Sequence, residues 1–323
     1  MGKKNEGSAG SRLKALAGQN GIIVVFLLLL VICSFVSNKF FTSSNLLNIG
    51  RQTVAIALIA FAEGILLING RTDLSAGSTM CLAGLVGLNV CVATNSIVLG
   101  LLASIVVSMA VSLFSSIFVA YLGLHHYIVT LAMQMAIRGI CFIYTGGLII
   151  TLTGDKFNIL GQAHIFGIPI SILIMLAVFV CFWILLAKTR LGRSFYAMGG
   201  NKEAARAAGI NVEKNTVVAY LISGIFIGFA GFLFASRLNS GAPGAGVGFE
   251  GQGIASAVVG GISFGGGVGK ASGALIGAFI MGVISNILNL KAVDSYVQQV
   301  INAGLILFAV TIDVVSKRKK LGR

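Results

Sequence analysis

The chain has 323 residues, of which 57% are hydrophobic and only 10% are charged, and its mean hydropathy is +0.98. About a quarter of the residues of a soluble globular domain are charged, so this composition excludes a soluble protein and indicates an integral membrane protein. The net charge of +14 fits basic residues that flank membrane spans and fix their orientation, and no nucleic-acid partner is expected.

Apolar segments of about 20 residues, the length that crosses a bilayer, recur along the whole chain. Ten transmembrane helices are predicted, at residues 21–37, 52–69, 74–93, 97–122, 127–148, 167–187, 215–236, 251–265, 270–290 and 295–314. The eighth, GQGIASAVVGGISFG, is short and rich in glycine, which predicts a broken or re-entrant segment that lines a cavity. The expected fold class is an all-α polytopic membrane protein with about ten transmembrane segments.

The positions of the basic residues predict which side of the membrane each connection faces. With ten spans and a cytoplasmic N-terminus, most of the 23 Lys and Arg residues fall in cytoplasmic segments. This strong positive-inside bias predicts that both termini are cytoplasmic. The expected organisation is a basic N-terminal tail at 1–20, a single transmembrane domain at 21–316 with a long cytoplasmic connection at 188–214, and a basic C-terminal tail at 317–323.

Charged residues inside apolar segments are candidates for a transport path. Glu63 and Arg138 each fall within a predicted span, where a charge is costly and usually faces a cavity or an opposite charge. Mutual pairing of Glu63 with Arg138 and a role of both in a translocation path are equally open at this point. Among the uncharged polar residues of the spans, Asn286 is a further candidate for the path.

Two more carboxylates stand at the ends of apolar segments. Asp73 lies in RTDLSAG (71–77) and is expected to cap the helix that follows, with Arg71 close enough in sequence to neutralise it. A proton-relay role for Asp73 is the less favoured alternative. Glu250 opens the glycine-rich eighth segment, and it is a candidate for the path or for a structural polar contact.

The long connection at 188–214 interrupts the apolar sequence with a short alanine-rich helix. Asn201 is a favourable N-cap, Glu203 complements the helix dipole in the first turn, and Gly209 provides a stop, so a helix over Asn201–Ile210 is predicted. So short a helix is marginal alone in water and needs a surface to pack on. That surface is either the protein itself or a groove on a partner, which the small face flanked by Lys202 and Arg206 would suit.

No catalytic site emerges from the sequence. GGISFGGGVGK (260–270) resembles a phosphate-binding loop only superficially, because a Walker A motif ending at Lys270 requires glycine at 264 and serine or threonine at 271, where the chain has Phe264 and Ala271. No nucleotide site, metal site or other cofactor is therefore expected in this chain, and any ATP hydrolysis must come from another one.

Three stretches together resemble one protein family. RTDLSAG (71–77), LGRSFYAMGGNKEAARAAGINV (191–212) and AVVGGISFGGGVGKASGALIGAFIMGVISNILNL (257–290) are similar, in order and spacing, to the permease subunits of bacterial ABC importers for ribose, galactose and related sugars. The resemblance runs from about residue 20 through the tail YVQQVINAGLILFAVTIDVVSKRKK. The chain departs from it at Arg71, where the family usually has glycine, and at Gly251–Gln252, where it commonly has Leu-Asp.

The resemblance implies a non-enzymatic subunit of the bacterial inner membrane that translocates a pentose or hexose by alternating access. The implied partners are a cytoplasmic ABC ATPase that binds ATP-Mg, a sugar-binding protein that docks on outer loops 149–166 and 237–250, a second permease copy, and membrane lipid. In this family the cytoplasmic loop helix transmits the movements of the ATPase. That implied coupling role falls on Asn201, Lys202, Glu203, Ala204, Ala205, Arg206, Ala208 and Gly209. The alternative is an ion-coupled secondary transporter of a small polar solute that uses Glu63, Asp73 and Glu250.

Overall fold

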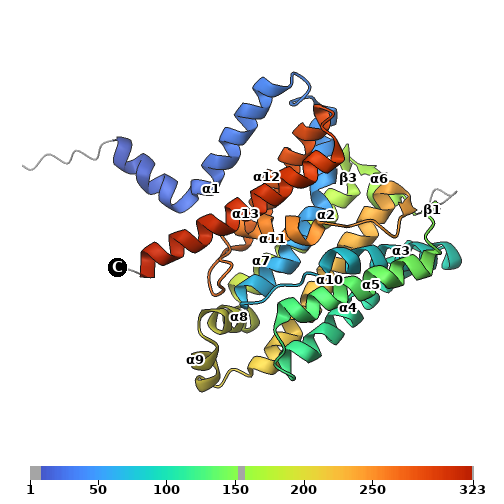
Figure 1. The fold of residues 1–323 in the computed structure, drawn as a ribbon. Coiled ribbons are helices and arrows are strands. Elements are labelled where there is room, and N and C mark those ends of the chain that lie inside the picture. Colours follow the sequence, from blue (N-terminus) through green and yellow to red (C-terminus); the bar gives the residue numbers. More distant parts are fainter. Residues whose placement is uncertain (1–8, 152–156, 322–323) are drawn as a thin grey trace, which may run out of the picture.

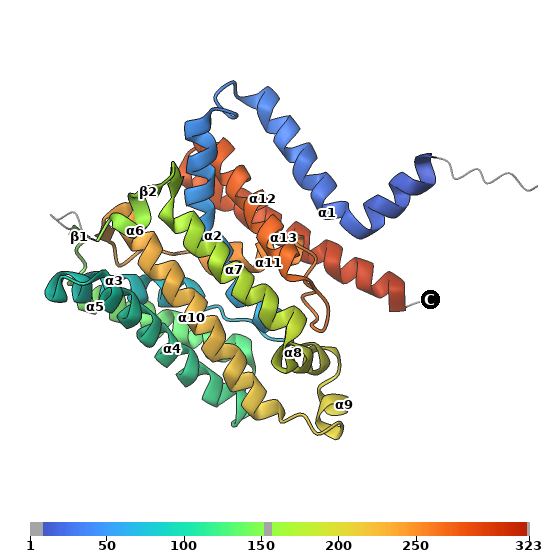
Figure 2. The same cartoon turned by 180° about the vertical axis from the view of Figure 1, so that it is seen from behind.

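The computed structural model describes residues 9–151 and 157–321, and it is almost entirely helical (Figure 1, Figure 2). The long helices are α1 (Ala9–Val36), α2 (Ser43–Ile68), α3 (Ala76–Thr94), α4 (Ile97–Ala120), α5 (His126–Thr145), α7 (Ile170–Lys188), α10 (Val212–Leu238), α12 (Ala271–Leu290) and α13 (Ser295–Leu321). The shorter ones are α6 (Ile159–Gln162), α8 (Arg190–Gly200), α9 (Lys202–Ala207) and α11 (Phe249–Val259). The all-α class is confirmed.

Each of the ten predicted segments coincides largely with a helix, but the helices differ in length. Within the described residues, eight are long and apolar enough to cross a membrane, namely α2, α3, α4, α5, α7, α10, α12 and α13. The apolar part of α1 is shorter, at Gly21–Val36. With eleven residues, α11 reaches only about 16 Å at 1.5 Å per residue, roughly half of the hydrocarbon thickness. The predicted break in the eighth segment is therefore confirmed.

The predicted tails are partly helical. Helix α1 begins at Ala9, inside the expected N-terminal tail 1–20, and α13 continues through residues 317–321 of the expected C-terminal tail. Residues 1–8, 152–156 and 322–323 lie outside the described residues. The cytoplasmic placement of both termini stays a prediction.

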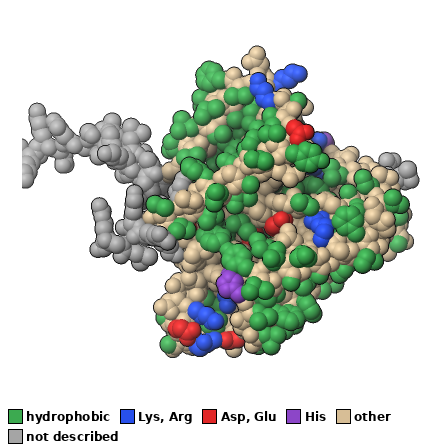
Figure 3. All heavy atoms as spheres, viewed as in Figure 1, with side chains coloured by type: hydrophobic (Ala, Val, Ile, Leu, Met, Phe, Trp, Pro, Cys, Tyr) green, Lys and Arg blue, Asp and Glu red, His purple; other side chains and the backbone are tan. Residues whose placement is uncertain are grey.

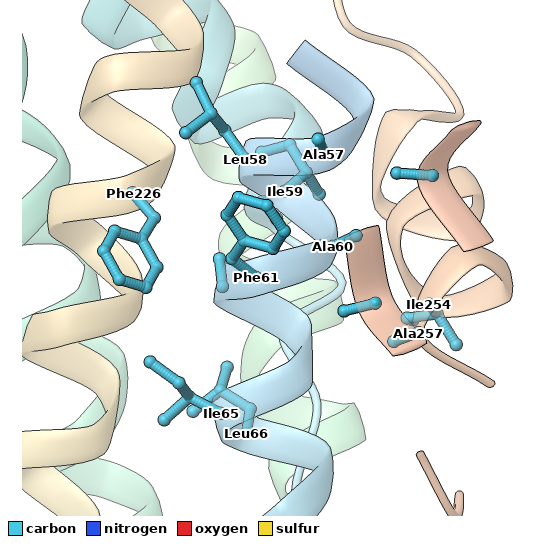
Figure 4. Packing of buried hydrophobic residues seen from close by; sticks show 14 of the residues in the cluster. Ala57, Leu58, Ile59, Ala60, Phe61, Ile65, Leu66, Phe226, Ile254 and Ala257 are labelled. Carbon is cyan, nitrogen blue, oxygen red and sulfur yellow. The ribbon is translucent and has the colours of Figure 1, made fainter. Parts of the chain in front are cut away.

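Helix α2 is the central element of the bundle, with α10 on one side and α11 on the other (Figure 4). Its segment from 54 to 68 is apolar on every face apart from Glu63 and Gly64, which is the pattern of a helix surrounded by protein. The ring of Phe61 stacks on Phe182 of α7, with centroids 5.1 Å apart, and meets Phe226 of α10 edge-on at 6.5 Å. These three rings join α2, α7 and α10 at the middle of the bundle.

Glycines allow close contacts between the helices. A Cβ added to Gly228 would lie 2.6 Å from the Cα of Ile105, and one added to Gly277 would lie 1.9 Å from the carbonyl oxygen of Ser256. The pairs Gly224/Gly228 and Gly273/Gly277 thus bring α10 against α4 and α12 against α11. Both contacts are within one chain.

At the end of the bundle away from α8 and α9, α6 joins α7 to α10. The backbone N–H of Gly161 donates to the hydroxyl of Ser236, and the side chain of Gln162 donates to the carbonyl of Arg237, both at 2.9 Å. Ile170, the first residue of α7, donates its N–H to Ala163 at 3.0 Å. The start of α7 and the end of α10 are therefore fastened to the same short helix.

Two pairs of very short antiparallel strands lie at the same end. Strand β1 (Ile150–Thr151) pairs with β4 (Ser240–Gly241), and β2 (His164–Ile165) pairs with β3 (Ile168–Pro169). The β1–β4 pair joins the loops 149–166 and 237–250, on which the resemblance implies that the sugar-binding protein docks. Asp155 and Lys156, which that expectation would place in the first loop, lie outside the described residues.

Candidate coupling and transport sites

The connection 188–214, which we call the coupling segment, contains two helices where one was predicted. The first, α8, begins after Thr189, whose hydroxyl accepts the N–H of Gly192 at 3.0 Å and so acts as an N-cap. Its buried residues are Gly192, Phe195 and Met198, spaced at intervals of three as on one face of a helix. This spacing is the sequence signal by which α8 could have been found.

The predicted cap and stop of α9 are present, but the helix is shorter than expected. The side-chain oxygen of Asn201 accepts the N–H of Ala204 at 2.9 Å, and Gly209 adopts a positive φ of 83° that glycine tolerates best. The helix covers Lys202–Ala207 rather than Asn201–Ile210. Residues 208–210 lie outside the helix, because Ile210 turns back to pack against Met198 and Ala205.

The small residue at the centre of the predicted docking face points inward. Ala205 is 4% exposed and packs against Met198, Ile210 and Val212. The expectation that Ala205 presents its methyl group to a partner is therefore corrected, because that methyl completes a small core within the coupling segment. The outer surface of α9 is formed by exposed residues, which are Lys202, Glu203, Ala204, Arg206, Ala207 and Ala208.

Ion pairs fix α9 on the first turn of α10. Arg206 lies 3.6 Å from Glu203, within α9, and also forms a close charge-assisted contact with Glu213 of α10. Exposed pairs of this kind contribute little stability, but together with the core around Ala205 they fix the orientation of α9. The coupling segment is thus an ordered unit with an alanine-rich outer surface.

Helix α8 contacts the inner end of the transmembrane bundle through glycine. A Cβ on Gly199 would lie 1.9 Å from the carbonyl oxygen of Ile68 and 2.6 Å from the backbone nitrogen of Gly267. The N–H of Gly267 donates to the same Ile68 carbonyl at 2.9 Å, and the hydroxyl of Tyr196 donates to the carbonyl of Gly269 at 2.9 Å. Burial raises the pKa of Tyr196, so it stays a hydroxyl donor. Helix α8 is therefore in direct contact with both α2 and the loop that follows α11.

Asp73 organises the turn between α2 and α3, although not as the predicted N-cap. Helix α3 begins at Ala76 with Ser75 in the cap position, and one oxygen of Asp73 accepts the N–H of Ser75 at 2.8 Å and its hydroxyl at 2.5 Å. Burial raises the pKa of the Asp73 carboxyl, and these two bonds partly oppose the shift. Arg71 donates instead to the carbonyl and side-chain oxygens of Asn69, so the expected neutralisation of Asp73 by Arg71 is wrong.

The proposed pairing of Glu63 with Arg138 is also wrong. Glu63 is fully buried and accepts the N–H of Asp73 at 3.3 Å, whereas Arg138 donates to the carbonyls of Pro243 and Ala245 at 2.7 Å each. The guanidinium donates to the backbone of the turn that leads into α11, where the thiol of Cys81 is a second donor to the carbonyl of Pro243. In Figure 3, acidic and basic side chains are visible in the middle of a largely hydrophobic face of the molecule. Glu63 is not among them, because it is fully buried.

Glu250 lies in the first turn of α11, as the sequence predicts, and connects α11 to α5. One of its oxygens accepts the side-chain amide of Gln134 at 3.1 Å and the N–H of Gly248 at 3.2 Å. The other oxygen is packed so closely on α3 that a Cβ on Gly77 would lie 2.1 Å from it. The acids Glu63, Asp73 and Glu250 are near enough to interact electrostatically with one another. The structure therefore brings together three of the predicted polar positions.

Asn286 belongs to a buried side-chain pair between α12 and α2. Its amide donates to the side-chain oxygen of Asn45 at 2.9 Å, and Asn45 donates back to the oxygen of Asn286 at 3.1 Å. The two residues are 1% and 7% exposed. This reciprocal pairing of buried side chains gives Asn286 a role in packing α12 against α2.

Replacing Asn286 by alanine is expected to destabilise the protein without changing its affinity for substrate. The substitution leaves the amide of Asn45 buried with one partner fewer, which costs about 1–3 kcal/mol. Thermal unfolding in detergent should show a lower midpoint, and the substrate concentration for half-maximal uptake should not change. The control is Asn48→Ala on the exposed side of α2. A change in half-saturation with normal unfolding would return Asn286 to the path.

Comparison with known proteins decides the family. Residues 45–310 match the family described as "Branched-chain amino acid transport system / permease component", which covers most of the chain. The chain belongs to this permease family. The chain is therefore a multi-pass protein of the bacterial inner membrane, like the other members of this family.

Several relatives of the permease cover nearly its whole length. It is 36% identical over 304 residues to the ribose import permease of Escherichia coli (strain K12), with 93% of this chain and 95% of the relative covered. It is 37% identical over 322 residues to the ribose import permease of Haemophilus influenzae, covering 98% and 99%. The L-arabinose ABC transporter permease of Azospirillum brasilense is 35% identical over 298 residues, covering 92% and 88%. No solved structure is similar to the permease at a significant level.

Proposed function

We propose that the permease is the membrane subunit of an ABC importer and translocates a monosaccharide, a pentose or hexose. The observation that carries the proposal is the ordered coupling segment, in which α9 is capped by Asn201, ended at Gly209 and oriented by the core around Ala205. The names of the relatives support a sugar as the substrate, since they include permeases for ribose, arabinose and allose. Galactose stays a prediction.

In this proposal a separate ATPase binds ATP-Mg and holds the outer surface of α9. A movement of the ATPase would displace α9 and α8 together, because Ala205 and Met198 share one small core. Through Gly199 the displacement would reach α2 and the loop after α11. An extracytoplasmic sugar-binding protein would dock where β1 and β4 join the outer loops, and a second permease copy would complete the assembly.

The geometry gives less support to the ion-coupled transporter. Glu63 bonds to the backbone of Asp73, Asp73 bonds to Ser75, and Glu250 bonds to Gln134 and Gly248. Each of the three carboxylates therefore holds an element end in place, which is a structural use. Uptake that fails without the ATPase, with the proton gradient intact, is the outcome that favours the ABC importer.

A bulky side chain on the outer surface of α9 is expected to uncouple transport. Ala204 is exposed, so Ala204→Phe should leave the permease folded but block close approach of the ATPase to the helix. The measurement is ATP hydrolysis in reconstituted vesicles containing the permease, its candidate ATPase and a sugar-loaded binding protein. We expect stimulation by the loaded binding protein to fall by about tenfold, the effect of losing roughly 1.4 kcal/mol of contact energy.

The matched control is Ala93→Phe, an exposed alanine at the far end of α3. It should insert, unfold and stimulate hydrolysis like the wild type. Normal stimulation by the Ala204→Phe variant would contradict the coupling role of α9. Ala205→Leu is unsuitable for this purpose, because it would overfill the core of the coupling segment and disturb the fold itself.

A further inference from the structure

A cavity lies where α7 meets the coupling segment and the start of α12. It has a volume of about 250 Å³, several times the roughly 30 Å³ that one water molecule occupies. Its lining includes Trp183 and Leu186 of α7, Tyr196 of α8, and Lys270 and Ser272 at the start of α12. Figure 2 shows α7 on the surface of the bundle with α8 crossing its end.

One lysine lines this cavity and a second lies against the ring of Trp183, which is part of the lining. Lys270 lines the cavity, and the ammonium group of Lys188 lies 5.8 Å from the ring centroid of Trp183. Both lysines are exposed, and the ion pairs found among the described residues involve neither of them. Helix α12 adds to the positive potential, because its N-terminus opens at Lys270 without a side-chain cap.

An apolar surface leads away from the cavity along α7. Leu176, Val180, Trp183 and Ile184 are 41%, 49%, 44% and 44% exposed, and their spacing places them on one side of the helix. The lysines stand at the end of this surface, where the membrane span stops. A tryptophan and lysines at the end of a span mark the level of the lipid headgroups.

We propose that this cavity binds the headgroup of an anionic phospholipid, whose acyl chains lie along the exposed surface of α7. The phosphate would sit between Lys188 and Lys270, with the hydroxyl of Ser272 and the N-terminus of α12 as further donors. Basic pockets between transmembrane helices bind anionic headgroups in this way. The site adjoins the coupling segment through Tyr196, so a bound lipid would brace α8 against α7 and α12. The inference does not depend on which solute the permease carries.

Trp183 is the only tryptophan of the chain, which makes its fluorescence a direct reporter of the site. The full-length permease is reconstituted in phosphatidylcholine vesicles that contain, at equal mole fraction, either brominated phosphatidylglycerol or brominated phosphatidylcholine. We expect stronger quenching by the anionic lipid. Because each lysine near the membrane surface contributes about fivefold to binding of an anionic lipid, Lys188→Gln combined with Lys270→Gln should remove the preference.

The control variant combines Lys39→Gln with Lys291→Gln, two exposed lysines outside the site, and it should keep the preference. Thermal unfolding of both double variants should match the wild type. Equal quenching by the two lipids in the wild type would overturn the proposal, as would an unchanged preference in the Lys188/Lys270 variant. Loss of the preference when inorganic phosphate is added at constant ionic strength would identify a soluble anion as the occupant. If the Lys188/Lys270 variant no longer associated with the ATPase but was quenched like the wild type, the two lysines would form a protein contact. A soluble anion and a protein contact each overturn the lipid assignment.

Discussion

Gly199→Ala is expected to reduce transport by the permease strongly. The new methyl group would lie 1.9 Å from the carbonyl oxygen of Ile68 and 2.6 Å from the nitrogen of Gly267, and neither backbone atom can move without displacing α2 or the loop after α11. Overpacking of this kind costs about 1–3 kcal/mol, and every 1.4 kcal/mol is about tenfold in an equilibrium. Uptake of sugar by the reconstituted importer should therefore fall about tenfold or more.

The neighbouring residue provides the matched control. Gly200 ends the same helix, and an added Cβ there would meet no atom within 4 Å, so Gly200→Ala should transport like the wild type. Because α9 remains intact in the Gly199→Ala variant, the ATPase should still associate and hydrolyse ATP. The rate of hydrolysis should no longer depend on the binding protein. Full transport by Gly199→Ala would show that α8 does not transmit movement through this contact.

Arg138→Ala is expected to destabilise the turn that leads into α11. The guanidinium donates to the carbonyls of Pro243 and Ala245, and both would lose a donor in a region with little water. The carbonyl of Pro243 keeps the thiol of Cys81 as a donor, so the main loss is at the carbonyl of Ala245. An unsatisfied carbonyl costs about 1–3 kcal/mol, and a loss of this size in the free energy of unfolding is expected. The measurement is thermal unfolding in detergent together with uptake after reconstitution.

Two further variants separate anchoring from direct contact with the solute. Both bonds come from Nη1 of Arg138. Arg138→Lys keeps the charge and a nitrogen with several N–H donors, but its side chain is shorter, so we expect intermediate stability. Lys291→Ala, at an exposed position, should be neutral. If Arg138→Ala unfolded normally and changed only the solute concentration for half-maximal uptake, Arg138 would contact the transported solute instead of anchoring the turn.

The sequence predicted those features of the fold that depend on interactions between neighbouring residues. Long apolar runs specify the membrane helices, the glycine-rich sequence after Glu250 specifies a broken one, and Asn201 and Gly209 specify the ends of α9. Each of these features depends on residues that are close together in the chain. The structure has a helix at each of these places, but among the described residues only eight helices are long and apolar enough to cross a membrane, and α9 is shorter at both ends.

Contacts between distant residues were not predictable in the same way. Nothing local pairs Asn286 with Asn45, or directs Arg138 to the carbonyls of Pro243 and Ala245 rather than to Glu63. Charge alone suggested an ion pair, whereas in the structure the guanidinium donates to two backbone carbonyls of the turn. The inward position of Ala205 also depends on tertiary packing, since its neighbours in the core come from α8 and α10 as well as from the turn after α9.

The attachment of α6 has a mechanical consequence for α7 and α10. At one end these helices are fastened through Gly161 and Ile170, and at the other they are joined through the coupling segment. Phe61 of α2 fills the space between them by contacting Phe182 and Phe226. Helices α7 and α10 are therefore connected to each other at both ends and both contact α2 through Phe61, so we expect a displacement of α9 to move these three helices together.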